Sequence, residues 1–263
     1  MQNNLDQFYT NVNYAKYVLD VISKKININD YDTIFEPSAG TGSFYNLLDK
    51  EKRVGIDLEP KCDGVVKQDF LKYKYSNLKG KILTVGNPPF GKNSSLAVKF
   101  FNQAALFSDV IAFILPRTFN KSSIQNRLHK KFHLLTSEIV PDNSFVFNNK
   151  PYDVWCVFQI WIKKNVNRVK QKRYTIKDVK DYFILSDKEN SDFAIQRVGA
   201  AAGKIKIDFK RYSPSSHYFI KSINPITLNT FKKCNFKDVK YNTVGNPSIS
   251  LSELVKKFLD GLR

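Results

Sequence analysis

The most distinctive polar segment of the chain is Asn87-Pro88-Pro89-Phe90, which directly follows the apolar run 82–86. Two prolines fix the backbone after a predicted strand, so the Pro88 carbonyl and the Asn87 side chain are held side by side. Both oxygens can accept hydrogen bonds from one exocyclic amino group, and the Phe90 ring offers a face on which a planar ring can stack. Accepting both N–H groups localises the nitrogen lone pair. The segment therefore predicts a site where an amino nitrogen attacks a methyl group in line.

A second segment, Phe-Glu-Pro-Ser-Ala-Gly-Thr-Gly-Ser-Phe at 35–44, follows another predicted strand. Gly40 and Gly42 allow a tight turn and a close approach of the backbone to a ligand. Dinucleotide sites place a pyrophosphate at such a turn. Glu36 would repel that anion and instead suits a ligand that carries an ammonium or sulfonium charge. A G-x-G sequence also occurs in ordinary strand-to-helix turns, so the segment by itself fits either role.

Two more carboxylates follow predicted strands. Asp57 stands fifteen residues after Gly42 and can accept hydrogen bonds from both hydroxyls of a ribose, or else cap a helix. Asp69 can accept from an adenine amino group while Phe70 packs on the base, although Phe70 fits core packing as well. Ligands of open α/β sheets bind outside the carboxyl ends of the strands, so we expect these side chains to share one edge.

The elements that must position these residues alternate between strand and helix. Strands are expected at 32–36, 53–57, 65–66, 82–86, 110–115, 134–140 and 154–162, and helices at 12–24, 43–50, 96–107, 119–132 and 252–262. Such alternation predicts an α/β fold with a mostly parallel sheet. His129 and His133 have the i, i+4 spacing of a helix at the end of the expected helix 119–132, and Lys130 and Lys131 indicate a basic helix face rather than a zinc pair.

In this order the motifs resemble those of class I S-adenosylmethionine-dependent methyltransferases of the N6-adenine DNA type, with Asn87-Pro88-Pro89-Phe90 as the catalytic tetrapeptide. The resemblance covers roughly residues 5–162. It implies a Rossmann-like, seven-stranded mixed sheet whose last strand is antiparallel, with 134–140 and 154–162 as strands six and seven. It also implies direct methyl transfer without a metal ion. The residues that it assigns to S-adenosyl-L-methionine are Phe8, Tyr9, Thr10, Glu36, Pro37, Ser38, Ala39, Gly40, Gly42, Asp57, Asp69, Phe70 and Asn87.

The resemblance further implies that the target base is extruded into the pocket. Phe145 or Phe147, after strand six, would hold that base, and both fit loop packing equally well. Arg117, after strand five, would meet a phosphate or else simply begin a helix. One departure is the segment 58–64, which is too short for the helix that the family usually has there.

Charge divides the chain into two parts. Of the 42 Lys and Arg and 24 Asp and Glu, residues 1–162 carry 20 and 15, and residues 163–263 carry 22 and 9. We expect a catalytic domain at 1–162 and a basic region at 163–263 that contacts nucleic acid, with the loss of affinity in salt that phosphate contacts bring. The region is small for base-by-base recognition, so a protein partner is a further expectation. The basic side chains expected near nucleic acid are Lys163, Lys164, Arg168, Arg197 and Lys204.

Several functions remain open at this point. DNA is the expected substrate, and the main alternative is adenosine N6 methylation of RNA, including a cap-adjacent adenosine. Release-factor glutamine methyltransferases resemble the chain in the same tetrapeptide, usually with Tyr at the position of Phe90; the positive charge disfavours this alternative. A non-catalytic nucleic-acid-binding subunit would keep the fold, and the complete set of motifs disfavours it.

The cysteines and the apolar runs indicate the cellular compartment in which the protein is expected. Cys62, Cys156 and Cys234 show no C-x-x-C spacing, so a disulfide framework is excluded and structural zinc is not expected. The apolar runs fall short of the roughly 20 residues of a membrane span, and the N-terminus lacks an apolar signal core. We therefore expect a soluble protein of the cytoplasm, or of a nucleoid or viral-factory equivalent, neither secreted nor membrane-bound.

Overall fold

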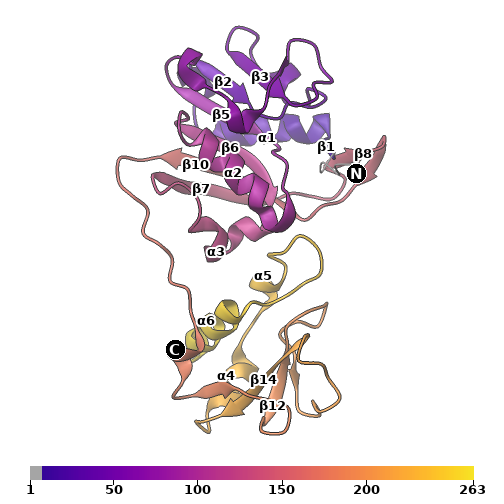
Figure 1. Cartoon of the computed structure of the whole chain (residues 1–263), viewed down its shortest axis with the longest axis vertical. Helices are drawn as coiled ribbons and strands as arrows, with labels where there is room; N and C mark the ends of the chain where they lie inside the picture. Colours follow the sequence, from indigo (N-terminus) through magenta and orange to yellow (C-terminus); the bar gives the residue numbers. More distant parts are fainter. Residues whose placement is uncertain (1–7) are drawn as a thin grey trace. The chain divides into compact units, whose positions relative to one another are not determined.

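The computed structural model describes residues 8–263, which form two compact units (Figure 1). The first unit extends to Lys170 and the second begins at Gln171. The break therefore falls inside the basic run 163–173, a few residues beyond the expected boundary after Ile162.

The first unit is built on a seven-stranded sheet with the order β4-β3-β2-β5-β6-β10-β7. Its strands are β2 (Thr33–Glu36), β3 (Arg53–Asp57), β4 (Val66–Lys67), β5 (Ile82–Gly86), β6 (Val110–Pro116), β7 (Phe132–Ile139) and β10 (Cys156–Lys163). Strand β10 runs antiparallel to both neighbours, whereas the other pairs are parallel. The fold is thus the expected Rossmann-like α/β fold with an antiparallel last strand.

Two longer helices flank this sheet. Helix α1 (Val12–Lys25) lies behind the sheet in Figure 1, and α2 (Ser95–Ala104) lies in front of it. The side chain of Asn11 accepts a hydrogen bond from the Asn13 amide and caps α1, so the expected helix 12–24 is confirmed. The core between the layers contains fully buried Phe35, Phe101 and Trp161.

Two expected helices of the first unit are wrong in extent. The span 43–50 contains only the single turn η2 (Tyr45–Leu47), because the chain must turn back at once to enter β3. The span 119–132 is broken into η6 (Arg117–Asn120) and α3 (Ser122–Gln125) by the extended backbone of Lys121. His129 consequently lies in a turn and His133 in β7, so the expected basic helix face does not exist.

A small antiparallel sheet lies beside the large one in the first unit. It consists of β1 (Tyr9–Thr10), β8 (Phe145–Phe147) and β9 (Lys150–Tyr152), in the order β1-β8-β9. Asn148 and Asn149 turn the chain between β8 and β9 with positive φ angles, as Asn tolerates. The pairing brings the N-terminal strand next to residues that follow it by more than 130 positions.

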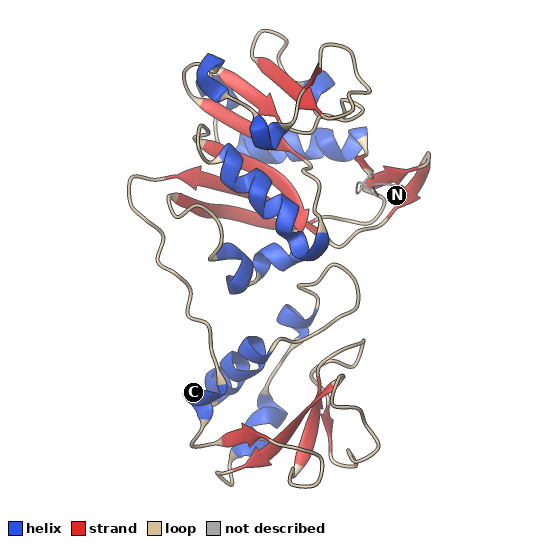
Figure 2. Cartoon of the chain, in the orientation of Figure 1, coloured by secondary structure: helices blue, strands red, loops and turns tan. Residues whose placement is uncertain are grey.

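The second unit has its own four-stranded antiparallel sheet, ordered β11-β14-β12-β13. Its elements, coloured by type in Figure 2, are η7 (Ile176–Val179), β11 (Phe183–Leu185), β12 (Phe193–Gln196), β13 (Ile205–Lys206), β14 (His217–Ser222), α4 (Thr227–Lys233), α5 (Lys237–Lys240) and α6 (Leu251–Gly261). A capping box of Ser250 and Glu253 begins α6, so the expected C-terminal helix is confirmed.

The two faces of this second sheet differ. Phe193, Ile195 and Ile220 face a core that includes side chains of α4 and α6. The alternate positions face the other way and form only a small cluster of Ala194, Phe209 and Phe219, with Tyr212 packed against it. The second face therefore lacks a covering layer of helices among the described residues.

Candidate active site

A cavity of about 290 Å³ opens at the carboxyl ends of β2, β3 and β5. The expected cofactor residues that line it are Phe8, Tyr9, Thr10, Glu36, Pro37, Ser38, Ala39, Gly40, Asp57, Asp69, Phe70 and Asn87, together with Pro89 of the tetrapeptide. Parallel strands bring their carboxyl ends to one edge, so motifs spread over 80 residues meet there. Gly42, Pro88 and Phe90 do not line the cavity.

Glu36 is the most unusual group in the cavity wall. It ends β2, is only 1% exposed, and its Oε2 atom has no hydrogen-bond partner among the described residues. Burial raises the pKa of the Glu36 carboxyl well above its usual range; a backbone hydrogen bond with Tyr45 opposes this shift, and the charge of Asp57 adds to it. A buried carboxyl oxygen without a partner is costly, and a cationic ligand would remove that cost.

Asn87 presents a second buried acceptor to the same cavity. Its Oδ1 atom is buried and has no hydrogen-bond partner in the part of the chain that the structure describes. The Asn87 main-chain carbonyl accepts a hydrogen bond from Ser38 Oγ at 3.2 Å, which ties the tetrapeptide to the loop after β2. A side-chain amide oxygen that is held in place and left unsatisfied is ready to accept from a ligand N–H group.

The Phe90 ring does not present the free stacking face expected from the sequence. It is 4% exposed, and its centroid lies 5.2 Å from that of Phe8 at an interplanar angle of 67°. Phe8 also packs edge-on against Phe145, with 5.0 Å between centroids. The main-chain carbonyl of Phe90 accepts hydrogen bonds from the amides of Leu96 and Ala97. The tetrapeptide therefore also stabilises the first turn of α2.

The two carboxylates after β3 and β4 also organise the surrounding backbone. Asp57 Oδ2 accepts from the Gly40 amide and Oδ1 from the Glu59 amide, both at 2.8 Å. Asp69 caps the short helix η3 (Phe70–Lys72) by accepting from the Leu71 amide at 2.9 Å. Each carboxylate has further lone pairs, so these contacts hold it in place and leave acceptor capacity for a ligand.

Phe70 belongs to both the core and the cavity. Its ring is 4.9 Å from that of Phe100 and 5.8 Å from that of Phe35, and it is almost fully buried. Both of its expected roles are therefore compatible with its position, because a core ring whose edge reaches the cavity can contact a ligand.

The two glycines of the turn have different roles. The Tyr9 ring packs against Gly40, and a Cβ atom at position 40 would lie 2.8 Å from this ring. The lack of a side chain at Gly40 therefore allows the Tyr9 ring to pack directly on the turn. A Cβ atom at Gly42 would lie 2.5 Å from Cys62 Sγ, and its φ is +82°. Gly42 thus packs against the segment after β3 rather than lining the cavity, which corrects its expected place among the ligand contacts.

The N-terminal strand closes another side of the cavity. Thr10 is 6% exposed, and its Oγ1 atom has no partner among the described residues. The Lys61 ammonium lies 5.0 Å from the centroid of the Tyr9 ring, so residues after β3 reach the N-terminal strand. Thr10 therefore adds a third unsatisfied polar atom, beside those of Glu36 and Asn87, to one cavity.

Sequence reasoning missed nine residues of the cavity wall. They are Thr41, Ser43, Phe44, Leu58, Glu59, Gln68, Leu71, Leu96 and Phe100. Most are neighbours of predicted residues. Leu96 and Phe100 are different, because they come from α2, and their i, i+4 spacing on an amphipathic helix indicated only core packing.

The residues expected at nucleic acid in the first unit, Phe145, Phe147 and Arg117, differ in exposure. Phe145 is buried in β8, whereas Phe147 is 42% exposed and packs on Tyr152. The Arg117 guanidinium stacks on Trp155, with 5.4 Å from Cζ to the ring centroid, and its Nε donates weakly to the Cys156 carbonyl. Phe147 and Arg117 are thus the two that keep solvent-accessible surface.

The basic residues of the run 163–173 differ in exposure and in contacts. Lys163 and Lys164 are exposed. Arg168, in contrast, donates from Nε to the Phe132 carbonyl at 3.0 Å and from Nη2 to the Gln125 carbonyl at 2.8 Å. Arg168 therefore has a structural role, because its donors tie the segment after β10 to main-chain carbonyls of the same unit, and fewer of its donors are left for the expected phosphate contact.

Arg197 and Lys204 lie at the two ends of the turn 198–203 of the second unit, which is rich in Gly and Ala. Lys204 is exposed, whereas Arg197 is half-buried over the Tyr218 ring, 5.4 Å from Cζ to the centroid. Arg197 Nε is buried and has no partner among the described residues. The turn itself is closed by backbone hydrogen bonds, including that from the Gly203 amide to the Gln196 carbonyl.

Across residues 8–263, no group of three or more His, Cys, Asp and Glu side chains is arranged to hold a metal ion. No helix within the same span is both long and apolar enough to cross a bilayer. The three cysteines are unpaired, and burial raises the pKa of the Cys234 thiol to about 11.

Comparison with known proteins finds no matching family model and no matching curated protein. Among solved structures, the chain is similar to a candidate RNA methyltransferase from Pyrococcus horikoshii (17% identity, 60% of this chain and 87% of that chain, TM-score 0.47). It is also similar to a candidate class I S-adenosylmethionine-dependent methyltransferase from Listeria monocytogenes (15% identity, 65% of this chain and 65% of that chain, TM-score 0.47). A third similar structure is the 23S rRNA methyltransferase ErmE (12% identity, 59% of this chain and 70% of that chain, TM-score 0.41). At such low identity, the order of the strands itself carries the assignment of the fold.

Proposed function

We propose that the protein is an S-adenosyl-L-methionine-dependent methyltransferase that methylates the exocyclic N6 amino group of adenine in nucleic acid, with DNA as the preferred substrate. The single observation that carries the proposal is the pair of unsatisfied buried acceptors, Glu36 Oε2 and Asn87 Oδ1, in one cavity. One suits a cation and the other suits an amino group. Strand order and the position of the tetrapeptide after β5 agree with this role.

The cavity suits the cofactor in charge and in polar contacts. When bound, S-adenosyl-L-methionine would supply an electrophilic methyl group on a positively charged sulfur, and this sulfur would leave as a neutral thioether when its bond to the methyl group breaks. Glu36 would stabilise the positive charge of the ligand, and Asp57 would accept from its ribose hydroxyls. Phe70 and Asp69 would contact its adenine ring, and Thr10 would provide a polar contact on the side of the N-terminal strand. The carboxylates at this edge also disfavour a phosphate-rich ligand in the same place.

Asn87 and Pro88 would orient the substrate amino group. One N–H group would donate to Oδ1 of the cavity-lining Asn87 and the other to the carbonyl of Pro88, which stands between Asn87 and Pro89 in the chain although it does not itself line the cavity; this arrangement would leave the nitrogen lone pair free for attack. Neither oxygen is basic enough to retain a proton, so the extra proton of the methylated amino group is released to water. Catalysis would then depend on position and fixed dipoles rather than on a strong base.

A base that stacks on Phe90 must first displace Phe8. Both rings are in contact with each other, and Phe8 leads directly into β1, which pairs with β8 over only two residues. Extrusion of the target base would therefore be coupled to movement of the N-terminal strand.

The test is transfer of a labelled methyl group to unmethylated DNA and to RNA, followed by identification of the methylated base. The proposal expects N6-methyladenine in DNA, and labelling of RNA alone would overturn the preference for DNA. Asn87→Ala should lower turnover by about 100-fold or more, the scale of removing one preorganised polar group, while cofactor binding is largely retained. Asn29→Ala removes an exposed Asn and serves as the matched control. Turnover of Asn87→Ala equal to that of the control would refute the catalytic role.

A further inference from the structure

The sheet face of the second unit that carries Ala194 and Phe219 gathers positive charge around one tyrosine. Lys206 Nζ and Arg211 Cζ each lie 5.2 Å from the centroid of the Tyr212 ring. The His217 ring stacks on the same tyrosine, with 4.5 Å between centroids and an interplanar angle of 23°. Three groups that are cationic or can be protonated thus converge on one aromatic side chain.

The strand register places these groups on one face. Lys206 pairs with Ala194 and His217 pairs with Gln196, so their side chains fall on the face opposite to the helix-covered core. On this same face the Lys188 ammonium lies 6.0 Å from the Phe219 ring. The positive charge therefore extends along the sheet beyond the tyrosine.

His217 has an unsatisfied nitrogen in this cluster. The residue is 6% exposed, and Nε2 is buried with no partner among the described residues. Nδ1 is engaged by Ser216 Oγ at 2.9 Å. Burial lowers the pKa of His217; a backbone hydrogen bond with Ser213 opposes this shift, and the Lys206 charge adds to it, so the cluster disfavours the protonated ring until an anion is bound. A buried polar atom without a partner indicates a ligand that is still to be supplied.

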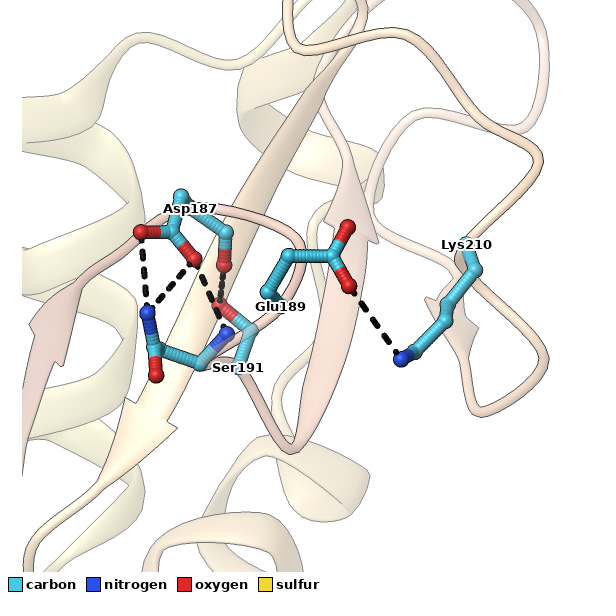
Figure 3. A network of polar contacts seen from close by, with 5 residues as sticks. Asp187, Glu189, Ser191 and Lys210 are labelled. Atoms are coloured by element: carbon cyan, nitrogen blue, oxygen red, sulfur yellow. Dashed lines mark hydrogen bonds and ion pairs between the residues drawn. The ribbon is translucent and has the colours of Figure 1, made fainter.

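The acidic groups close to this cluster do not neutralise it. Asp208 is 3.9 Å from Arg211, but both side chains are largely exposed, so this pair is weak. In the neighbouring loop, Asp187 accepts from Asn190 and Ser191 donates to the Asp187 carbonyl, while Glu189 contacts Lys210 (Figure 3). The carboxylate of Asp187 therefore holds its own loop, and Lys206 and His217 are left without an acidic partner in the contacts described.

From these contacts we infer that Lys206, Arg211 and His217 form a binding site for a backbone phosphate of a nucleic-acid strand, built on the Tyr212 ring. A phosphate offers several acceptor oxygens and negative charge to donors that arrive from β13, β14 and the loop between them. His217 would donate from Nε2 once the anion favours its protonated form. Residues 171–263 carry 18 Lys and Arg against 9 Asp and Glu, which favours a polyanion over a single small ion. The inference rests on the proposed function only in taking nucleic acid as the polyanion.

The experiment measures binding of a fluorescent oligonucleotide to the full chain over a range of salt concentrations, without cofactor. Lys206→Gln combined with Arg211→Gln should weaken binding about tenfold or more and should lower the salt slope by about 0.7–0.9 for each lost phosphate contact. The matched control is Lys232→Gln combined with Lys233→Gln, which removes the same charge from exposed positions on α4. Equal losses of affinity and of slope in both double variants would overturn the site.

Two further measurements separate the alternatives. His217→Gln keeps a polar side chain of similar reach. It should weaken oligonucleotide binding, while its melting temperature should change no more than that of the Lys232→Gln, Lys233→Gln control. Binding equal to that of the wild type would show that His217 is not part of the site. Polyglutamate should compete less well than unlabelled oligonucleotide of equal charge, and equal competition would overturn nucleic acid as the partner. Methyl transfer assayed on the same variants keeps the two ideas distinct. Loss of binding in a protein that methylates no nucleic acid would refute the proposed function alone, whereas unchanged binding with active methylation would refute this site alone.

Discussion

Replacement of Glu36 by Gln tests the electrostatic reasoning about the cavity most directly. The amide keeps the size of the side chain and removes its charge. If Glu36 stabilises a cationic ligand through a charge-assisted contact, its loss should cost about 1.5–3 kcal/mol of binding free energy. At 1.4 kcal/mol per tenfold, cofactor affinity should fall about 10- to 150-fold at neutral pH.

The pH dependence of the same variant gives a second, independent signature. Burial raises the pKa of Glu36 above its usual value of 4.5, so the carboxyl must lose its proton before it can attract a cation. Affinity of the wild type should therefore increase with pH, by up to about tenfold per unit below the raised pKa, whereas Glu36→Gln should lack this component. Glu51→Gln, an exposed position outside the cavity, controls for the loss of one negative charge.

Stability should respond in the opposite direction. The folded state holds the Glu36 proton more tightly than the unfolded chain does, so the stability that it contributes is full below pH 4.5 and is lost as pH rises through the raised pKa. Without cofactor, Glu36→Gln should therefore gain stability relative to the wild type as the pH rises toward neutrality. Isothermal calorimetry and melting curves at several pH values measure both effects. If Glu36→Gln binds cofactor with the affinity and pH slope of the wild type, the assignment of Glu36 to a cationic ligand is refuted.

Two structural predictions follow from the corrected roles of Gly42 and Arg168. Gly42→Ala should destabilise the fold by at least about 1 kcal/mol, because its φ is +82° and its Cβ would meet Cys62 Sγ at 2.5 Å. Adding Cys62→Ala should recover part of the loss in thermal denaturation, and no recovery would show that this contact does not matter. Arg168→Ala should cost about 1–3 kcal/mol, since it removes charge-assisted hydrogen bonds to the carbonyls of Phe132 and Gln125. Its salt slope for nucleic-acid binding should change no more than that of Lys170→Ala, and a clearly larger change would restore the phosphate role of Arg168.

The amino-acid sequence alone was sufficient for the sheet and for the edge at which the site lies. The strands β3 and β5 were predicted to the residue, because apolar and β-branched runs bounded by polar turns are local signals. Alternation of strands with helices implied parallel pairing, and parallel pairing brings Glu36, Asp57 and Asn87 to one edge. The spacing of those motifs therefore located the cavity before any contact was known.

Only the tertiary structure decided how each side chain is used, because the deciding neighbours are distant in the chain. Phe8 covers Phe90 from more than 80 positions away, and Arg168 is held by carbonyls more than 30 positions before it. The helices expected at 43–50 and 119–132 are short for a similar reason, since periodicity continues where the backbone must turn to form the next strand. Likewise, Tyr212 and His217 stand close together in the sequence, in a segment of hydroxyl and aromatic residues, and only the pairing of β12, β13 and β14 brings Lys206 to the same face. Local patterns specify elements, whereas burial and hydrogen-bond partners depend on contacts that no local pattern contains.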